Sequence, residues 1–339
     1  MSASWSRGLL LGLLVSVVVV AITSLNGSPT PVPSEAALET RVAASPIIST
    51  QPVAMSQTRT PTPSAIAALA TATSSPTHVP AQASHGSSAP TVTPTPPSTP
   101  NVERIIGRSV QGRPIVAHRI GKGPIKVALV GDIHGGFEKN THVLAQQLIS
   151  HFVAHPDEVP AHISLWIIPT VNPDGLATGH RWNANGVDLN RNADTDLDGC
   201  AGNDWVADTV GLEGPHPGAG GEHPFSEPES RLLRDFLADS WIAVFYHSAA
   251  EAIFRDACQR HAPTARLAVT LSEGSGYPVP EEGWAGYPIT GDFGDYLAGE
   301  GVAAVTVELS NHDDPEFDRN LEGVLSVLAN VDEILSAEA

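Results

Sequence analysis

Two histidines and two glutamates stand at the ends of apolar segments that lie far apart in the chain. His134 and Glu138 follow one apolar run, His247 closes a second, and Glu308 lies within a third. Imidazole and carboxylate are the preferred non-thiolate ligands of zinc, and a catalytic zinc takes three protein ligands and leaves one position open. Two histidines and one glutamate satisfy that count, so the second glutamate is free to act as a base.

Glu308 is the sharpest of these signals because it stands in the otherwise apolar segment VTVELS. A carboxylate buried in such a strand without a partner costs free energy. Glu308 therefore needs either a chemical role or a cationic partner, and a salt bridge to an arginine is the structural alternative to catalysis.

The segments around these residues alternate between apolar strands and helical patterns. Strands are predicted at 126–131, 163–170, 241–247 and 303–309, and helices at 140–153, 226–239, 263–272 and 317–335. Buried strands that alternate with helices are typical of an α/β domain with a mixed, mostly parallel central sheet. Ligands of such sheets bind beyond the carboxyl ends of the strands. The four candidate residues are expected to meet at this edge.

Further polar motifs stand between these segments in a definite order. They are HGGFE (134–138), NPDG (172–175), GVDLNRN (186–192), HS (247–248) and VTVEL (305–309). Together they resemble the zinc carboxypeptidases of the carboxypeptidase A/B type, the funnelins, over essentially all of 101–339. The short segment between Arg181 and Asn190 is similar to the compact bacterial members. The resemblance implies a three-layer α/β fold, one zinc ion and hydrolysis of peptide bonds at the carboxyl terminus.

The resemblance also implies the metal site. His134, Glu138 and His247 would hold zinc, and Asp188 would orient His134, a common role for a carboxylate beside a zinc-bound imidazole. The family usually places two residues between the first histidine and the glutamate, whereas three separate them here. A turn through the two glycines of HGGFE would absorb the extra residue, because glycine tolerates positive φ.

The remaining site residues are implied in the same way. Glu308 would be the general base, and Arg181 would stabilise the charge that develops on the scissile carbonyl oxygen. Asn190 and Arg191 would bind the carboxylate at the substrate's terminus, since an arginine can grip a carboxylate through two parallel hydrogen bonds. Such a clamp favours action at a free carboxyl terminus.

Two residues between the third and fourth predicted strands bear on specificity. Tyr287 stands four residues before a glycine, as does the mobile tyrosine of the family, and an ordinary loop aromatic is the alternative. Asp292 lies in the segment that shapes the side-chain pocket of the family. It would favour a basic or diaminopimelate-like terminal residue, although an aspartate at this place could instead cap the following helix.

A run of alternating aspartates, Asp194, Asp196 and Asp198, precedes Gly199 and resembles the start of a calcium loop. The twelfth position is Trp205 rather than glutamate, so an acidic, solvated loop is the other interpretation. Both a calcium site and a solvated loop remain open.

Cys200 and Cys258 are the only cysteines. No CxxC spacing accompanies them, and an exported domain permits a disulfide. By closing a loop, the bond would stabilise the folded state by about 4 kcal/mol in the chain-entropy model. We expect the disulfide, with two buried thiols as the alternative.

Composition divides the chain of 339 residues into three parts. Residues 1–25 contain Arg7 followed by an apolar run at 8–25, which predicts a cleaved signal peptide or a retained signal anchor. Residues 26–100 hold 14 of the 29 prolines and no aromatic residue, which predicts a disordered linker. Residues 101–339 would form the catalytic domain, outside the cytoplasm, with membrane contact only through an uncleaved N-terminal segment.

The net charge of the chain limits the classes of partner that it can bind. The 18 basic and 37 acidic side chains give a net charge of −19, which argues against nucleic-acid binding. The predicted function is an exported zinc metallocarboxypeptidase acting on peptides or cell-wall peptides. A murein-type amidase or peptidase and a deacylase of the aspartoacylase type are the enzymatic alternatives. An inactive cell-surface binding module is the non-enzymatic one, and no expected catalytic residue is missing to favour it.

Overall fold

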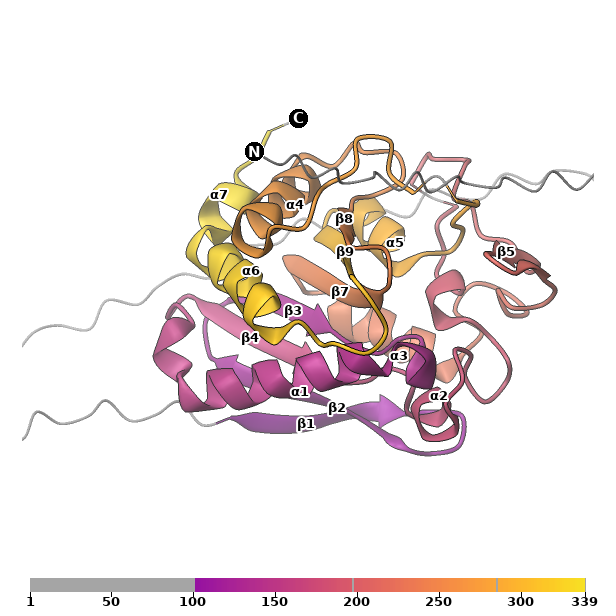
Figure 1. Ribbon diagram of the computed structural model, residues 1–339, viewed down its shortest axis with the longest axis horizontal. Coiled ribbons are helices and arrows are strands. Elements are labelled where there is room, and N and C mark those ends of the chain that lie inside the picture. Colours follow the sequence, from indigo (N-terminus) through magenta and orange to yellow (C-terminus); the bar gives the residue numbers. More distant parts are fainter. Residues whose placement is uncertain (1–100, 197, 285, 339) are drawn as a thin grey trace, which may run out of the picture. The chain divides into compact units, whose positions relative to one another are not determined.

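A seven-stranded mixed sheet forms the centre of the computed structural model, which describes residues 101–338 apart from Leu197 and Ala285 (Figure 1). Its strands lie in the order β1-β2-β4-β3-β7-β9-β8. Their bounds are β1 Val102–Arg108, β2 Pro114–Gly121, β3 Ile125–Val130, β4 Ile163–Ile168, β7 Ile242–Ser248, β8 Ala252–Phe254 and β9 Ala303–Leu309. The four central strands β4, β3, β7 and β9 are parallel, whereas β1, β2 and β8 pair antiparallel at the two edges. The predicted α/β fold with a mixed sheet is confirmed.

Helices cover both faces of the sheet. The longer ones are α1 Lys139–Ala154, α3 Pro228–Leu237, α4 Ala262–Ser275 and α6 Phe317–Ala329, and the shorter ones are α2 Pro173–Thr178, α5 Phe293–Gly299 and α7 Val331–Leu335. Single 3₁₀ turns lie at η1 Gly135–Glu138, η2 Pro156–Glu158 and η3 Leu189–Arg191, and β5 Thr209–Gly211 pairs with β6 Gly214–His216 in a separate hairpin. The result is the expected three-layer arrangement.

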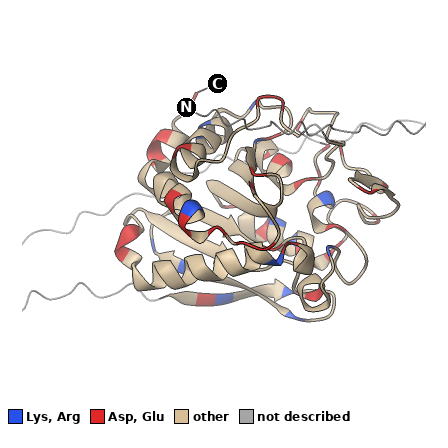
Figure 2. Ribbon diagram, in the orientation of Figure 1, with Lys and Arg blue, Asp and Glu red and all other residues tan. Residues whose placement is uncertain are grey.

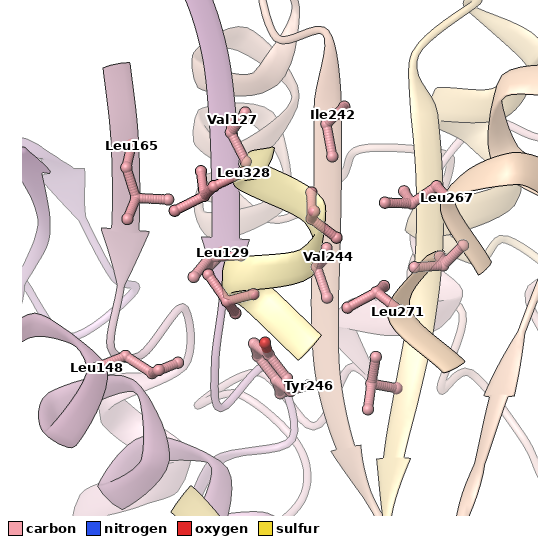
Figure 3. Packing of buried hydrophobic residues seen from close by; sticks show 14 of the residues in the cluster. Val127, Leu129, Leu148, Leu165, Ile242, Val244, Tyr246, Leu267, Leu271 and Leu328 are labelled. Atoms are coloured by element: carbon pink, nitrogen blue, oxygen red, sulfur yellow. The ribbon is translucent and has the colours of Figure 1, made fainter. Parts of the chain in front are cut away.

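Two apolar clusters explain why the central strands are hydrophobic throughout. Val127 and Leu129 of β3 pack into one cluster with residues of α1, α4, α6 and α7, and Figure 3 shows Leu148, Leu267 and Leu328 of that cluster against the strands. Ala128 and Val130, the alternate residues of the same strand, pack into a second cluster with residues of α3 and α5. Because successive strand residues point to opposite faces, a strand covered on both sides must be apolar at every position.

The predicted strands agree with the observed ones to within two residues at each end. The predicted helix 140–153 is α1, and the predicted helix 263–272 lies inside α4. The single closing helix predicted over 317–335 is wrong in one respect, since it breaks at Asn330 into α6 and α7. The helix predicted from 226 begins at Pro228 instead, and the hydroxyl of Ser226 donates to the Glu227 side chain.

Cys200 and Cys258 form a disulfide with their Cα atoms 5.8 Å apart, which confirms the expected pairing. The bond links the loop after η3 to the segment after β8. Both segments border the site described below.

The predicted export segment (1–25) and linker (26–100) lie outside the described residues. None of the described helices combines the length and the apolar composition that crossing a membrane requires. Acidic residues are spread over helices and loops in many parts of the fold, as Figure 2 shows.

Candidate active site

The three predicted metal ligands converge at the carboxyl edge of the sheet. His134 follows β3, Glu138 closes η1, and His247 lies at the end of β7. The Nδ1 atom of His134 lies 2.7 Å from Oε1 of Glu138 and 3.0 Å from Nδ1 of His247. The His247 Nδ1 atom lies 3.1 Å from the other Glu138 oxygen, Oε2. All three residues are buried.

This donor set fits a zinc ion. Two imidazole nitrogens and a carboxylate face one another at short range, and two such nitrogens can both turn lone pairs inward only around a cation. Burial raises the pKa of Glu138, but the neighbouring His134 and His247 outweigh burial and hold that pKa below its usual range. Glu138 is therefore an anion at neutral pH, as a zinc ligand must be.

Asp188 determines which nitrogen of His134 faces this centre. Its Oδ1 atom lies 3.1 Å from Nε2 of His134, and its Oδ2 atom accepts from Nε of Arg181 at 2.8 Å. A proton on Nε2 directed at Asp188 leaves the Nδ1 lone pair turned toward Glu138. Burial acts to raise the pKa of Asp188, but Arg181 and His134 outweigh it and hold the pKa well below its usual range.

The unusual spacing between His134 and Glu138 is accommodated by η1. Gly135 has a φ of +54°, so the expected left-handed glycine is present. A Cβ atom on Gly135 would lie 2.5 Å from the carbonyl oxygen of His180, and one on Gly136 would collide with Cα of Gly179. The turn packs directly against the α2 region that carries the NPDG motif, which explains why glycines occupy both segments.

Glu308 reaches the same centre from β9. It pairs in register with His247 on β7, and its Oε2 atom is buried without a hydrogen-bond partner among the described residues. Burial and the Glu138 carboxylate raise the pKa of Glu308 to about 7. A carboxyl group poised near neutrality is suited to general acid–base chemistry.

A cavity of about 410 Å³ opens over these residues. It is lined by every predicted metal ligand and by the remaining predicted catalytic and substrate-binding residues, namely Glu308, Arg181, Asn190, Arg191, Tyr287 and Asp292. The structure thus brings together all of the predicted site residues. Asp188 contacts His134 but does not itself line the cavity.

The cavity wall shows which of these side chains already have partners. Asn190 donates to Oδ2 of Asp292 at 2.6 Å and accepts from the backbone of Phe293. Asp292 accepts from the backbone N–H of Asp295 and so caps α5, which was the structural alternative for this residue. Arg191 is buried and donates to the Asn190 carbonyl. The Tyr287 ring packs edge-on against Trp284.

Several residues of the cavity were not assigned to the site from the sequence, and His312, Asp256 and Asp295 are three of them. Nδ1 of His312 lies 2.9 Å from the hydroxyl of Ser248, the residue that follows the ligand His247. Asp256 and Asp295 also line the cavity, and Asp295 accepts from the backbone of Ala257 at 2.7 Å. The position of Asp295, four residues after Gly291, was the one available signal among them. Only the fold brings these distant segments together.

The structure gives the calcium prediction no support. Asp196 accepts from the backbone of Trp205, and Asp198 accepts from the backbone of Cys200 and from the side chain of Asn203. The Asp194 carboxylate contacts the backbone of Asp196. These aspartates cap turns of their own loop, and among the described residues they do not form a cluster of metal-binding atoms.

Comparisons with known proteins agree with this geometry. The zinc carboxypeptidase family model, peptidase M14, matches residues 97–317. Murein peptide amidase A of Escherichia coli is 30% identical over 152 residues, which is 42% of this chain and 56% of the relative. Carboxypeptidase B of Astacus astacus is 25% identical over 168 residues, 42% of this chain and 52% of the relative. The matched region thus spans about half the length of these two curated relatives.

Solved structures show the same fold. Bovine thrombin-activatable fibrinolysis inhibitor, in complex with a tick carboxypeptidase inhibitor, superposes with a TM-score of 0.57 at 18% identity, covering 69% of this chain and 90% of that one. Murein-tripeptide amidase from Escherichia coli O157 superposes with a TM-score of 0.52 at 22% identity. The superposition covers 72% of this chain and 95% of the amidase. On the family match and the converging site, the chain belongs to the zinc carboxypeptidase family.

Proposed function

We propose that this protein is an exported zinc metallocarboxypeptidase that hydrolyses the last peptide bond of its substrates, with Glu308 as the general base. One observation carries the proposal. His134, Glu138 and His247 converge on one point, and Glu308 stands beside them on the neighbouring strand. The export segment at 8–25 directs this activity outside the cytoplasm.

Zinc bound by these three side chains would polarise the scissile carbonyl and acidify a water molecule. Glu308 accepts the proton of the attacking water and passes it to the leaving amine. Asp188 holds the Arg181 guanidinium through Nε, and Nη1 lies 3.4 Å from Oε1 of Glu138. The N–H groups on Nη2 are available to the carbonyl oxygen as its negative charge grows.

Arg191 and Asn190 support exopeptidase action. Arg191 lies in the cavity wall with one Nη atom engaged by a backbone carbonyl, which leaves N–H groups for the terminal carboxylate of a substrate. Asn190 contributes by holding Asp292 and the start of α5 in place. Tyr287 lies across the same cavity and can cover the bound terminus.

Carboxyl groups in the cavity wall favour a cationic terminal side chain. Asp256, Asp292 and Asp295 all line the cavity and are each at most 9% exposed. One oxygen of Asp256 is buried without a hydrogen-bond partner among the described residues. A basic or diaminopimelate-like side chain would supply a partner for this oxygen of Asp256.

The second candidate function is hydrolysis of cell-wall peptides by a murein-type amidase. The match to murein peptide amidase A favours it, and an amino-bearing terminal residue would suit the acidic cavity. An aspartoacylase-like deacylase is the remaining enzymatic candidate. Arg191 in the cavity wall does not separate it from a carboxypeptidase, because N-acyl amino acids also carry a free carboxylate.

A substrate panel tests these functions. The full chain with measured zinc content is assayed on blocked dipeptides with a free carboxyl terminus, on the matching amides, on a murein tripeptide and on N-acyl amino acids. Preference for the free acid over the amide supports the carboxypeptidase. Equal hydrolysis of both would show that proposal to be wrong. Preferential cleavage of the murein tripeptide would establish the amidase, and cleavage of N-acyl amino acids alone would establish the deacylase.

A further inference from the structure

A second group of metal-binding side chains lies at the carboxyl-terminal end of α1. His151 lies in the last turn of α1 and His155 is the residue that caps the end of the helix, and their rings stack with centroids 4.6 Å apart. The turn η2 brings Oε2 of Glu158 to 2.6 Å from Nε2 of His151. One ligand atom from each of the three residues lies within 4.8 Å of the other two.

The local sequence HPDE produces this arrangement. Pro156 follows His155, and the residue before a proline avoids helical backbone angles, so α1 ends here. Pro156 then starts η2, whose backbone closes with the N–H of Glu158 donating to the carbonyl of His155 at 3.2 Å. Glu158 is thereby folded back onto the last turn of the helix.

The nitrogen atoms needed for a metal are available. Nδ1 of His155 donates to the backbone carbonyl of His151 at 3.0 Å, so the lone pair of the neutral ring is on Nε2. A hydrogen bond from the non-ligating nitrogen to a carbonyl is the usual support of a metal-bound histidine. The His151 ring also packs against the rings of Phe152 and Phe317, at centroid distances of 5.2 Å and 6.0 Å.

This cluster is separate from the catalytic centre. Glu138 immediately precedes α1, whereas His151 lies in its last turn, about 20 Å away at 1.5 Å per residue. In Figure 1, α1 runs along the sheet away from α2 and from the site beside it. The side chains of His151 and Glu158 are 18% and 34% exposed, so ions can reach them from solvent.

We propose that His151, His155 and Glu158 form a second site for a divalent transition-metal ion, which joins the end of α1 to η2. Two imidazoles and one carboxylate are suitable ligands for Zn²⁺ and for related divalent ions such as Co²⁺, Ni²⁺ and Cu²⁺. Three protein ligands leave coordination positions for water. The ion replaces the proton shared by His151 and Glu158. The three residues do not line the 410 Å³ cavity over the catalytic centre, so the role proposed for this metal is structural.

Zinc titration of the full chain tests the site, with bound metal counted after buffer exchange at each free-zinc level. His155→Ala and Glu158→Gln remove one ligand each, and both should bind one zinc fewer than the wild type. His162→Ala is the matched control, because His162 is an exposed histidine outside the cluster. It should bind as much zinc as the wild type.

The measured quantity is the difference in bound zinc between the wild type and each variant. This difference does not depend on whether the catalytic centre holds zinc. Peptidase activity of His155→Ala should stay at the wild-type level, since His155 is remote from the cavity. Equal zinc content in the wild type, His155→Ala and Glu158→Gln throughout the titration would overturn the proposal. A loss of zinc in His162→Ala equal to that in His155→Ala would overturn it as well.

Discussion

His247 and Glu308 are direct register partners on the adjacent parallel strands β7 and β9. Partners in such a pair project from the same face of a sheet, so the strand pairing sets the separation of the proposed ligand and the proposed base. Both side chains project from the carboxyl ends of strands rather than from loops. The proposed chemistry therefore rests on strands that are largely buried along their length.

Replacing Glu308 by glutamine should remove activity while leaving the metal in place. The amide keeps the shape of the side chain but does not accept a proton, so kcat should fall by about 10²–10⁴-fold. Zinc content measured on the same sample should match that of the wild type, because Glu308 is not one of the three ligands. Undiminished kcat in the variant would rule out Glu308 as the base.

Replacing Arg191 by lysine should weaken recognition of the terminal carboxylate. Lysine keeps the charge but loses the two-pronged hydrogen bond, worth about 1.5–3 kcal/mol for a charged partner. We expect kcat/KM on free-acid substrates to fall about 10–100-fold, with little change on the corresponding amides. Circular dichroism should verify folding, since Arg191 is buried. An unchanged acid-to-amide ratio would contradict the clamp.

Gly135→Ala should weaken zinc binding and destabilise the fold by more than the strain of an alanine at positive φ. Gly179→Ala is the matched control, because Gly179 has a φ of +77° but open space where a Cβ atom would stand, whereas a Cβ atom on Gly135 would meet the His180 carbonyl. The control should cost about 1 kcal/mol of unfolding free energy. Gly135→Ala should cost more and should also lower zinc affinity. Equal effects of the two substitutions on zinc binding would disprove the close-packing explanation.

Asp295 should make the protein less stable as the pH rises. Burial, with a further contribution from Asp292, raises its pKa to about 7. Between about pH 4 and pH 7 the folded protein holds a proton that the unfolded chain releases, so this contribution is complete below pH 4 and is lost as the pH passes 7. The loss is at most roughly 4 kcal/mol.

The measurement compares the free energies of unfolding of wild type and Asp295→Asn at pH 5 and pH 8. The wild type should lose stability relative to the variant as the pH rises. Asp313→Asn is the control, because Asp313 is exposed and should not alter the pH dependence. Parallel pH profiles for wild type and Asp295→Asn would contradict the prediction.

The site could be predicted from sequence to the extent that its residues stand beside strongly patterned segments. His134, His247 and Glu308 follow or occupy apolar runs, and the positions of those runs are local properties of the chain. Asp256 and His312 stand in irregular segments with no such pattern. They join the cavity only because β8 and the loop after β9 lie at the same edge of the sheet.

The sequence by itself determined the four central strands, their alternation with helices, the zinc-type donor set and the disulfide partners. Each of these depends on hydrophobic periodicity or on residue chemistry, which are properties of short stretches of chain. The tertiary structure alone decided strand order, the antiparallel edges and the break at Asn330, which depend on packing between distant segments. It also decided how Asn190 and Asp292 are used, since their hydrogen bonds cross about a hundred residues of chain. Contacts of that range form only when the sheet has assembled, and that is why a linear pattern does not reveal them.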